Sequence, residues 1–399
     1  FDLSPWLYMQ FMEPLGTSDS SVEASWNHQC NKWCDSLVNA AKELAPGLIR
    51  WGGISSAYYR WKEGVGARHL RKPFLNLVWG GIESNQIGTG EFCEFCEAVG
   101  ADKLFCVNFM SEGVKKWTKT PDGDIRTGDA EEAAAWVDYC NNPDNIQRIK
   151  NGRKEPYNVK LWQVGNETSY QSYCHGEDNS FTCEEAAKHT INFADAMRKA
   201  DPSIELIGWG DSGWARKMLE IAGEKIQYIA FHYHAYPIVS AEENVLKNND
   251  YRKDWDKTWD QLMGIWQPLQ KAIDKKREEI AGFNVKLAMT EGHFCLEGRN
   301  RCEVLSSWAA GVANARALNI QERNGDILKI ATLADFCGTR WMVNALYIER
   351  PSQRVHLMPV AHVMKLYRRH VGSKGIRVMQ TPDGLDISAS RDKNKIYLH

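Results

Sequence analysis

The sequence predicts an α/β fold in which eight β/α units close into a barrel, and three observations support this. Short runs of β-branched, aliphatic and aromatic residues alternate with longer amphipathic stretches, which is typical of repeated β/α units around a parallel sheet. The short runs number eight, the strand count of such barrels. With 399 residues, the chain is long enough for one barrel and a small remainder.

The expected strands are short and apolar, and the expected helices between them are longer. The strands are residues 7–12, 48–51, 103–109, 159–164, 204–209, 226–233, 285–290 and 342–348. The helices are residues 21–44, 90–99, 130–140, 183–199, 214–222, 255–280, 303–319 and 359–370. Several helices begin with a capping side chain, such as Thr182 before Glu184 and Asp129 before Glu131.

The pattern changes after residue 372. Short alternating segments at 375–380, 385–390 and 395–399 are separated by turns rich in Pro, Asp, Gly and Asn, which indicates a β-sheet. We therefore expect a (β/α)8 barrel over residues 1–372, followed at 373–399 by the start of a C-terminal β-sandwich-type sheet.

Charge and hydropathy exclude two classes of partner. The chain has 49 basic and 51 acidic residues without a block of like charge, so a nucleic acid partner is not expected. It contains no run of about 18 apolar residues, so no membrane span is expected. Nothing in the sequence fixes the oligomeric state, and a homo-oligomer is compatible with it.

Eleven cysteines indicate an oxidising compartment. Two pairs, Cys174 with Cys183 and Cys295 with Cys302, would each close a short loop, which suits a disulfide. The chain also opens on Phe1 rather than Met, as expected of a processed N-terminus. We therefore expect a secreted protein, either extracellular or periplasmic.

Two glutamates, Glu167 and Glu291, each follow an apolar strand-like run, the fourth and the seventh. The carboxyl ends of barrel strands meet at one face, so the two side chains should lie close together. One carboxyl group as proton donor and one as nucleophile or base is what glycosidic bond cleavage requires. The sequence therefore predicts a glycosidase with a carbohydrate substrate.

The two glutamates need different surroundings. Glu167 is the expected proton donor, which requires burial to raise its pKa towards neutrality. Glu291 must stay ionised, so it needs hydrogen-bond donors, for which His232, Tyr233 and His293 are candidates. Of these we favour Tyr233 as the group that orients Glu291.

Two patterns could bind a metal, but neither is complete. Cys93 and Cys96 have the spacing of half a zinc knuckle without a second half. His232 and His234 would share one face of a strand, with no third ligand in view. We expect no metal.

Several stretches of the chain, in order, carry a resemblance to a known family. They are residues 11–16, 49–53, 82–88 with Glu91-Phe92, 134–141, 162–167, 201–204 and 342–344. Together they resemble the α-L-arabinofuranosidases of glycoside hydrolase family 51, and the Asn-Glu and Glu pair is similar to the signature of clan A barrels. The resemblance runs from Tyr8 to Gly372.

The resemblance implies an activity and residue roles. Glu167 matches the family's acid/base, Glu291 its nucleophile, Asn166 its sugar-contacting Asn, and Glu13 its strand-one Glu that binds furanose hydroxyls. The implied enzyme releases terminal α-L-arabinofuranosyl residues from polysaccharide or oligosaccharide side chains. It retains anomeric configuration, with carboxyl groups about 5–5.5 Å apart. Neither a metal nor an organic cofactor is implied.

The chain departs from the family pattern around the sugar. Ile54 stands where the family has Asn or Cys, and Gly292-His293 stands where the family commonly has Trp after the nucleophile. Trp341 lies in the segment where the family tends to have a Gln that touches the sugar. We expect Trp341, His232 and His293 to contact substrate. Altered contacts leave other clan A activities open, namely a β-galactofuranosidase, β-xylosidase or endo-β-glucanase, as well as a non-catalytic carbohydrate-binding protein.

Overall fold

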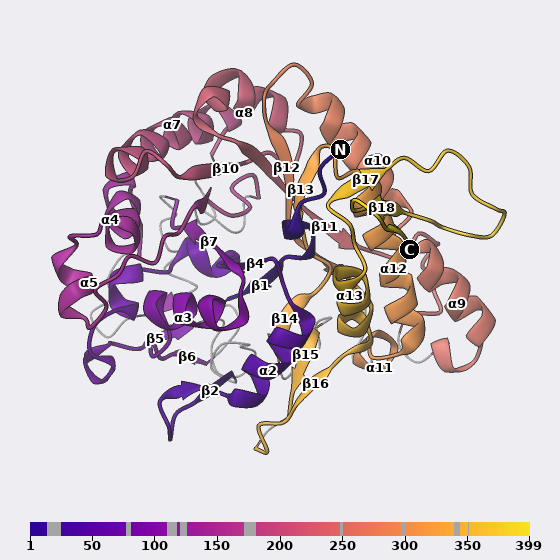
Figure 1. Cartoon of the computed structure of the whole chain (residues 1–399), viewed down its shortest axis with the longest axis horizontal. Coiled ribbons are helices and arrows are strands. Elements are labelled where there is room, and N and C mark those ends of the chain that lie inside the picture. The colour runs from indigo at the N-terminus through magenta and orange to yellow at the C-terminus, as the bar shows by residue number, and fades with distance from the viewer. Residues whose placement is uncertain are drawn as a thin grey trace.

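The structure is a computed structural model (Figure 1). It describes residues 1–13, 25–76, 81–109, 118–119, 126–170, 181–247, 250–296, 301–338, 344–349 and 351–399, with the backbone alone for 118–119 and 301–302. No helix among these residues is both long and apolar enough to cross a membrane.

Parallel strands form the barrel. In sheet order they are β13 (Leu328–Ala331), β12 (Lys286–Phe294), β11 (Tyr228–Ala235), β10 (Glu205–Trp209), β9 (Leu161–Val164), β7 (Asp102–Val107), β4 (Leu48–Trp51), β1 (Gln10–Met12) and β14 (Asp335–Gly338). Every neighbouring pair in this series is parallel. The predicted (β/α)8 barrel is confirmed.

One interrupted strand closes the barrel. Its first half, β13, pairs with β12, and its second half, β14, pairs with β1. The expected eighth strand at 342–348 is therefore wrong. Residues 344–348 form β15 (Asn344–Ile348), which pairs with β14 and with β16 (Val355–Leu357) and extends the sheet beyond the barrel.

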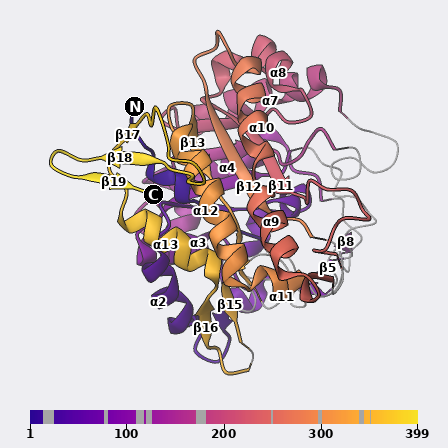
Figure 2. The ribbon, with the colours of Figure 1, turned by 90° about the vertical axis from the view of Figure 1, so that its right-hand side faces the viewer.

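Helices cover the outside of the barrel (Figure 2). They are α2 (Asp35–Leu44), α3 (Thr89–Val99), α4 (Ala130–Asn141), α5 (Ile146–Lys150), α7 (Cys183–Ala200), α8 (Ala215–Ala222), α9 (Trp255–Gly264), α10 (Pro268–Glu279), α11 (Arg301–Leu305), α12 (Trp308–Arg323) and α13 (Pro359–Arg369). α7 illustrates their pattern, because Thr182 and Glu185 form a capping box and Ala186, Phe193 and Met197 turn towards the sheet.

Short elements complete the described chain. The 3-10 turns are η1 (Pro5–Tyr8), η2 (Ile54–Ala57), η3 (Trp61–Gly64), η4 (Arg68–Leu70), η5 (Gly223–Lys225) and η6 (Asp250–Arg252). Two small sheets consist of β2 (Trp26–Asn27) with β3 (Lys32–Trp33), and of β5 (Phe74–Asn76), β6 (Ile82–Glu83) and β8 (Thr118–Lys119).

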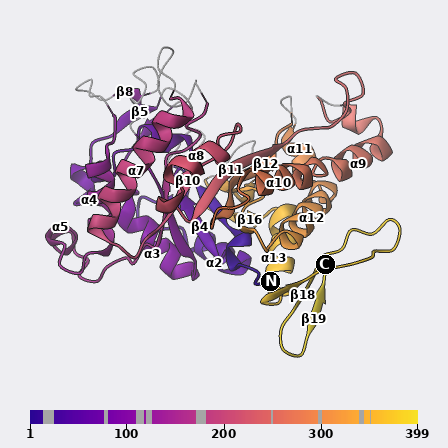
Figure 3. The same ribbon diagram turned by 90° about the horizontal axis from the view of Figure 1, so that it is seen from above.

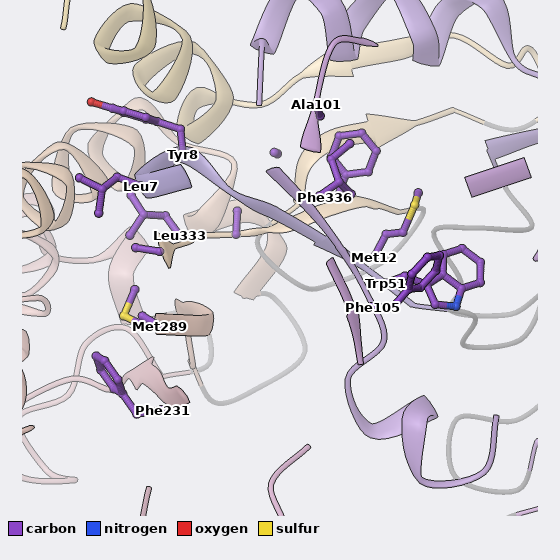
Figure 4. Close-up of a cluster of buried hydrophobic side chains, with 14 of the residues drawn as sticks. Leu7, Tyr8, Met12, Trp51, Ala101, Phe105, Phe231, Met289, Leu333 and Phe336 are labelled. Atoms are coloured by element: carbon purple, nitrogen blue, oxygen red, sulfur yellow. The ribbon is translucent and has the colours of Figure 1, made fainter. Parts of the chain in front are cut away.

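The pleat of the strands divides the core into two parts. Inside the barrel, one apolar layer consists of Met9, Leu48, Leu104, Leu161, Ile207, Ala230, Ala288 and Ile330 with Trp209. The alternate side chains, such as Trp51, Phe105, Phe231 and Met289, pack outward under the helices (Figure 4). Two residues beyond the inner layer, four strands carry polar side chains, which are Arg50, Gln163, His232 and Thr290.

A second sheet follows the barrel. Its antiparallel strands are β17 (Lys374–Ile376), β18 (Ala389–Arg391) and β19 (Ile396–Leu398). Figure 3 places β18 and β19 at the edge of the molecule opposite β5 and β8. The boundary expected at 372–373 lies just before β17.

The expected disulfides are not formed. Cys183 and Cys295 are free thiols, and Cys183 Sγ lies 3.6 Å from the backbone oxygen of Trp214, in a half-buried position that raises the pKa of its thiol to about 11. Cys174 lies outside the described residues, as does the side chain of Cys302. The prediction that these pairs form disulfides is therefore wrong, and they give no support for an oxidising compartment. Secretion stays a prediction.

Candidate active site

A buried guanidinium connects three strand ends at the mouth of the barrel. Arg50 on β4 donates from Nε to Gln163 Oε1 on β9 at 3.0 Å. Its Nη1 donates to Glu291 Oε1 at 2.8 Å, and its Nη2 to Asn166 Oδ1 at 2.6 Å. Because the donors of a guanidinium lie in one plane, Arg50 fixes these three acceptors relative to one another.

A β-bulge directs Glu291 into the barrel. β11 and β12 pair regularly as far as Phe231 and Met289, after which His232 pairs with Glu291 and leaves Thr290 as an extra residue. Both residues then reach the same imidazole. Thr290 Oγ1 lies 3.1 Å from His232 Nε2, and Glu291 Oε2 lies 3.6 Å from His232 Nδ1.

A glycine turn presents Glu167 after β9. Gly165 has a φ of +82° and Glu167 a φ of +50°. A Cβ on Gly165 would lie 2.7 Å from Thr168 Cγ2 and 2.9 Å from Phe109 Cβ, so both space and backbone angle require glycine here. Positive φ at Glu167 costs about 1–2 kcal/mol, which the surrounding contacts must offset.

The surroundings of Glu167 favour its protonated form. Burial, helped by the charge of Asp211, raises the pKa of Glu167 to about 7, although His234 and Arg50 act in the opposite direction. His232 Nδ1 lies 2.9 Å from Glu167 Oε1. Burial lowers the pKa of His232 to about 3, so this ring is a neutral hydrogen-bond partner at neutral pH.

The two glutamates approach each other across the mouth. Side-chain oxygens of Glu167 and Glu291 lie within 4.8 Å of one another and of a His232 nitrogen. Oxygens this close leave less than the about 6.5 Å that a water between two carboxyl groups needs. Glu167 has a raised pKa, and Glu291 is paired with a cation.

The same three side chains could in principle bind a metal ion, because each offers a ligand atom to a common point. Arg50 already compensates the charge of Glu291 at 2.8 Å, and a cation at this point would be repelled by the guanidinium. The donor set therefore fits a carboxyl pair better than a metal centre.

Glu13 lies beside this group. It follows β1, and its Oε2 accepts a hydrogen bond from the backbone N–H of Ser55 at 3.0 Å. A Cβ on Gly53 would come within 2.0 Å of Glu13 Oε1, so the glycine makes room for the carboxyl. Burial and the charge of Glu291 raise the pKa of Glu13 to about 8.

The remaining predicted contacts have mixed positions. His293 on β12 is buried, and its ring centre lies 4.5 Å from that of His234 on β11. Ile54 begins η2, directly after the glycine that contacts Glu13. Trp341 lies outside the described residues.

Tyr233 is not brought to Glu291. Side chains alternate along β11, so His232 and His234 face the barrel interior while Tyr233 faces outward. Its ring packs against Trp266 with centroids 5.9 Å apart. The expectation that Tyr233 orients Glu291 is therefore wrong, and Arg50 and His232 contact Glu291 instead.

Sequence reasoning missed Gln163 and Asp211 as polar groups of the site, and it considered His234 only as part of a metal pair. Gln163 accepts from Arg50, Asp211 accepts from the Tyr170 hydroxyl at 3.1 Å, and His234 stacks on His293. Gln163 follows an inward-facing leucine by two positions, so strand periodicity could have identified it. Asp211 lies in the turn after β10, for which no comparable signal exists.

Comparison with known proteins identifies the family. The model of the alpha-L-arabinofuranosidase 1 domain matches residues 40–282. The chain belongs to this family. The matched range contains Arg50, Glu167 and His232, whereas Glu13 and Glu291 lie outside it.

Curated relatives of this family match part of the chain. Alpha-L-arabinofuranosidase C of Emericella nidulans is 40% identical over 182 residues, which cover 44% of this chain and 32% of that protein. An intracellular exo-alpha-(1->5)-L-arabinofuranosidase of Acetivibrio thermocellus is 31% identical over 211 residues, covering 50% and 38%. The chain thus matches only about a third of the length of these relatives.

Solved structures of the family share the fold. The alpha-L-arabinofuranosidase from Thermotoga maritima, determined as an arabinose complex, aligns with a TM-score of 0.73 at 24% identity. The alignment covers 100% of this chain and 82% of that one. At this identity the likeness establishes the barrel and the C-terminal sheet, and no more.

Proposed function

We propose that this chain is a retaining glycoside hydrolase that releases terminal α-L-arabinofuranosyl residues from polysaccharide or oligosaccharide side chains. The observation that carries the proposal is the pair of Glu167 and Glu291, which lie within 4.8 Å in different electrostatic surroundings. Family membership supports arabinofuranose as the sugar. The names of both curated relatives agree with it.

In the first step, Glu291 attacks the anomeric carbon. Glu167 gives its proton to the glycosidic oxygen, the C–O bond breaks, and the alcohol leaves while the sugar becomes an ester of Glu291. Arg50 holds the attacking carboxylate in place through the 2.8 Å ion pair. In the second step Glu167 takes a proton from water, the water oxygen attacks the anomeric carbon, and Glu291 leaves.

His232 determines which oxygen of Glu167 carries the acid proton. If the Thr290 hydroxyl donates to Nε2, the neutral ring carries its proton on Nδ1 and donates to Glu167 Oε1. The acid proton then belongs on Oε2. In this arrangement His232 positions the acid without exchanging a proton with substrate.

Substitution of the two glutamates tests the proposal. Glu291→Ala should abolish hydrolysis of 4-nitrophenyl α-L-arabinofuranoside. Glu167→Ala should slow substrates with poor leaving groups by about 100-fold or more and activated ones much less, and azide should partly restore turnover. In the wild type, kcat/KM should fall tenfold per pH unit above about pH 7, where Glu167 loses its proton.

A panel of nitrophenyl furanosides and pyranosides measures the sugar preference. Release from the arabinofuranoside alone supports the proposal, whereas release only from a galactofuranoside, a xyloside or a glucan would assign another clan A activity. Binding of oligosaccharide without turnover by the wild type would indicate a carbohydrate-binding protein.

A further inference from the structure

Two tryptophans on α9 are exposed, although most tryptophans among the described residues are buried. Trp255 and Trp259 are 63% and 46% exposed, whereas Trp51, Trp162 and Trp266 are at most 1% exposed. A spacing of four residues places both indoles on one face of the helix. Exposed aromatic rings gathered on one surface mark a binding region rather than a core.

The two indoles line a cavity of about 350 Å³ between α9, α11 and the start of α12. Tyr251, Asp256, Glu303 and Ser307 also line it. The Tyr251 ring meets Trp255 edge to face, with centroids 6.3 Å apart. The volume lies within the range of small-ligand sites, about 300–1,000 Å³.

Polar groups of the cavity are held in place. Glu303 accepts a hydrogen bond from the Tyr251 hydroxyl at 2.5 Å and is also paired with Arg252. Arg252 offsets the charge of Glu303, so the cavity is not strongly charged. Asp256 provides a second carboxylate on the same helix as the indoles.

The cavity belongs to the mouth side of the barrel. α9 follows β11, which carries His232, and α11 follows β12, which carries Glu291. In Figure 3, α9 and α11 lie along the upper edge, as do β5 and β8, which follow the carboxyl ends of β4 and β7. A polysaccharide bound at α9 would therefore lie on the side of the barrel from which its sugar side chains can reach Glu167 and Glu291.

We propose that this cavity is a second carbohydrate-binding site, which holds a neutral oligosaccharide segment of the polymer whose side chain is cleaved. Indoles offer flat apolar faces for the C–H surface of a sugar ring, and carboxylates accept hydrogen bonds from its hydroxyls. Compensation of Glu303 by Arg252 suits an uncharged ligand better than a polyanion. The inference rests on the proposed function for the identity of the polymer.

Single substitutions of the indoles test the site. Trp255→Ala and Trp259→Ala should each weaken binding to a soluble arabinose-substituted xylan by about tenfold, the loss typical of removing an aromatic anchor, in native affinity electrophoresis. Their kcat/KM on 4-nitrophenyl α-L-arabinofuranoside should equal that of the wild type, because this substrate reaches only the catalytic pocket. KM for the polymer should rise.

Trp308→Ala is the matched control. Trp308 is 62% exposed at the first position of α12 but does not line the cavity. Its loss should leave polymer binding unchanged. Equal weakening in all three variants, or unchanged binding in Trp255→Ala and Trp259→Ala, would overturn the second site.

Two further outcomes separate the site from its alternatives. A wild type that cleaves no arabinofuranoside would refute the proposed function, while its polymer binding, compared with that of Trp255→Ala, still decides the second site. A dimer in sedimentation velocity that both Trp255→Ala and Trp259→Ala dissociate would instead assign the surface to a second copy of the chain.

Discussion

At the residue scale, three buried glutamates, Glu13, Glu167 and Glu291, all lie in the electric field of Arg50. Arg50 pairs directly with Glu291, while burial raises the pKa of Glu167 to about 7 and that of Glu13 to about 8. Ionising all three carboxyl groups at once would be unfavourable, because burial and mutual repulsion both disfavour the charged forms. The proposed acid, Glu167, therefore keeps its proton up to about pH 7, and a protonated Glu13 can donate a hydrogen bond.

Glu13→Gln should alter the pH dependence of stability. The folded pKa of about 8 exceeds the ordinary 4.5, so the stability that this group contributes is complete below pH 4.5 and is lost as pH rises to 8. Glutamine cannot ionise. Relative to the variant, the wild type should lose up to about 1.4 kcal/mol per pH unit across this window.

Thermal unfolding midpoints at pH 5, 6.5 and 8 measure this difference, with Glu131→Gln on the exposed face of α4 as the control. The wild type and Glu13→Gln should diverge as pH rises, while the control follows the wild type. Parallel curves for all three proteins would contradict a raised pKa at Glu13.

Strand periodicity decides which site residues the sequence can predict. Glu167 and Glu291 were predictable because each comes within three residues of the end of an apolar run. Tyr233 was misassigned because its neighbours on both sides, His232 and His234, face inward on a strand with a period of two. The extra residue Thr290 depends on the register between β11 and β12, which local sequence does not contain.

At the element scale, the turn after β9 determines where Glu167 points. Gly165 adopts a φ of +82° and leaves no room for a side chain beside Phe109. The turn also brings Asn166 to Arg50 at 2.6 Å. A shift of this turn would move the acid and the amide together.

Gly165→Ala should therefore lower kcat by more than the loss of folded protein accounts for. The added Cβ combines strain at positive φ with contacts of 2.7–2.9 Å, so Glu167 must move, and kcat should fall by about 100-fold. Gly100→Ala is the control, because Gly100 has a φ of +77° with nothing within 4 Å of the added atom.

Gly100→Ala should cost about 1–2 kcal/mol and leave kcat unchanged. Urea unfolding and steady-state kinetics on the aryl glycoside measure the two effects. Equal kcat values for both variants would show that the acid does not depend on this turn.

Element boundaries were less predictable than element types. The run from Leu328 to Gly338 is mostly apolar, as is typical of a strand buried on both faces, yet it was not among the predicted strands. The helix expected at 255–280 is two helices, and α10 begins at Pro268. Of the helix expected at 21–44, residues 35–44 form α2, after the hairpin of β2 and β3, while residues 21–24 lie outside the described part of the chain.

At the scale of the whole molecule, a buried carboxyl joins the two ends of the described chain. Glu322 on α12 accepts hydrogen bonds from the hydroxyls of Tyr8 and Ser388. His399 Nδ1 lies 3.1 Å from Glu322 Oε2 and stacks its ring on Tyr367. The segment before β1, a barrel helix and the C-terminal sheet therefore meet at one side chain.

Glu322→Ala should loosen this junction without affecting the mouth of the barrel. The Tyr8 hydroxyl and the His399 ring would lose their buried partner, at a cost of about 1–3 kcal/mol for each group. Tyr8→Phe removes one donor while retaining the ring, so it should cost only about 1 kcal/mol. Because β18 and β19 lie opposite β5 and β8, kcat at 25 °C should change less than about twofold in both variants.

Thermal unfolding and amide hydrogen exchange measure the effect together. Glu322→Ala should lower the thermal unfolding midpoint more than Tyr8→Phe does. In Glu322→Ala, amide hydrogens of β17, β18 and β19 should exchange faster while those of β11 and β12 keep their protection, because local opening follows the loss of local contacts. If Glu322→Ala accelerates exchange equally in all strands, the junction stabilises the barrel as a whole. If the folded variant loses turnover at 25 °C, the C-terminal sheet communicates with the site, contrary to the separation argued from the fold.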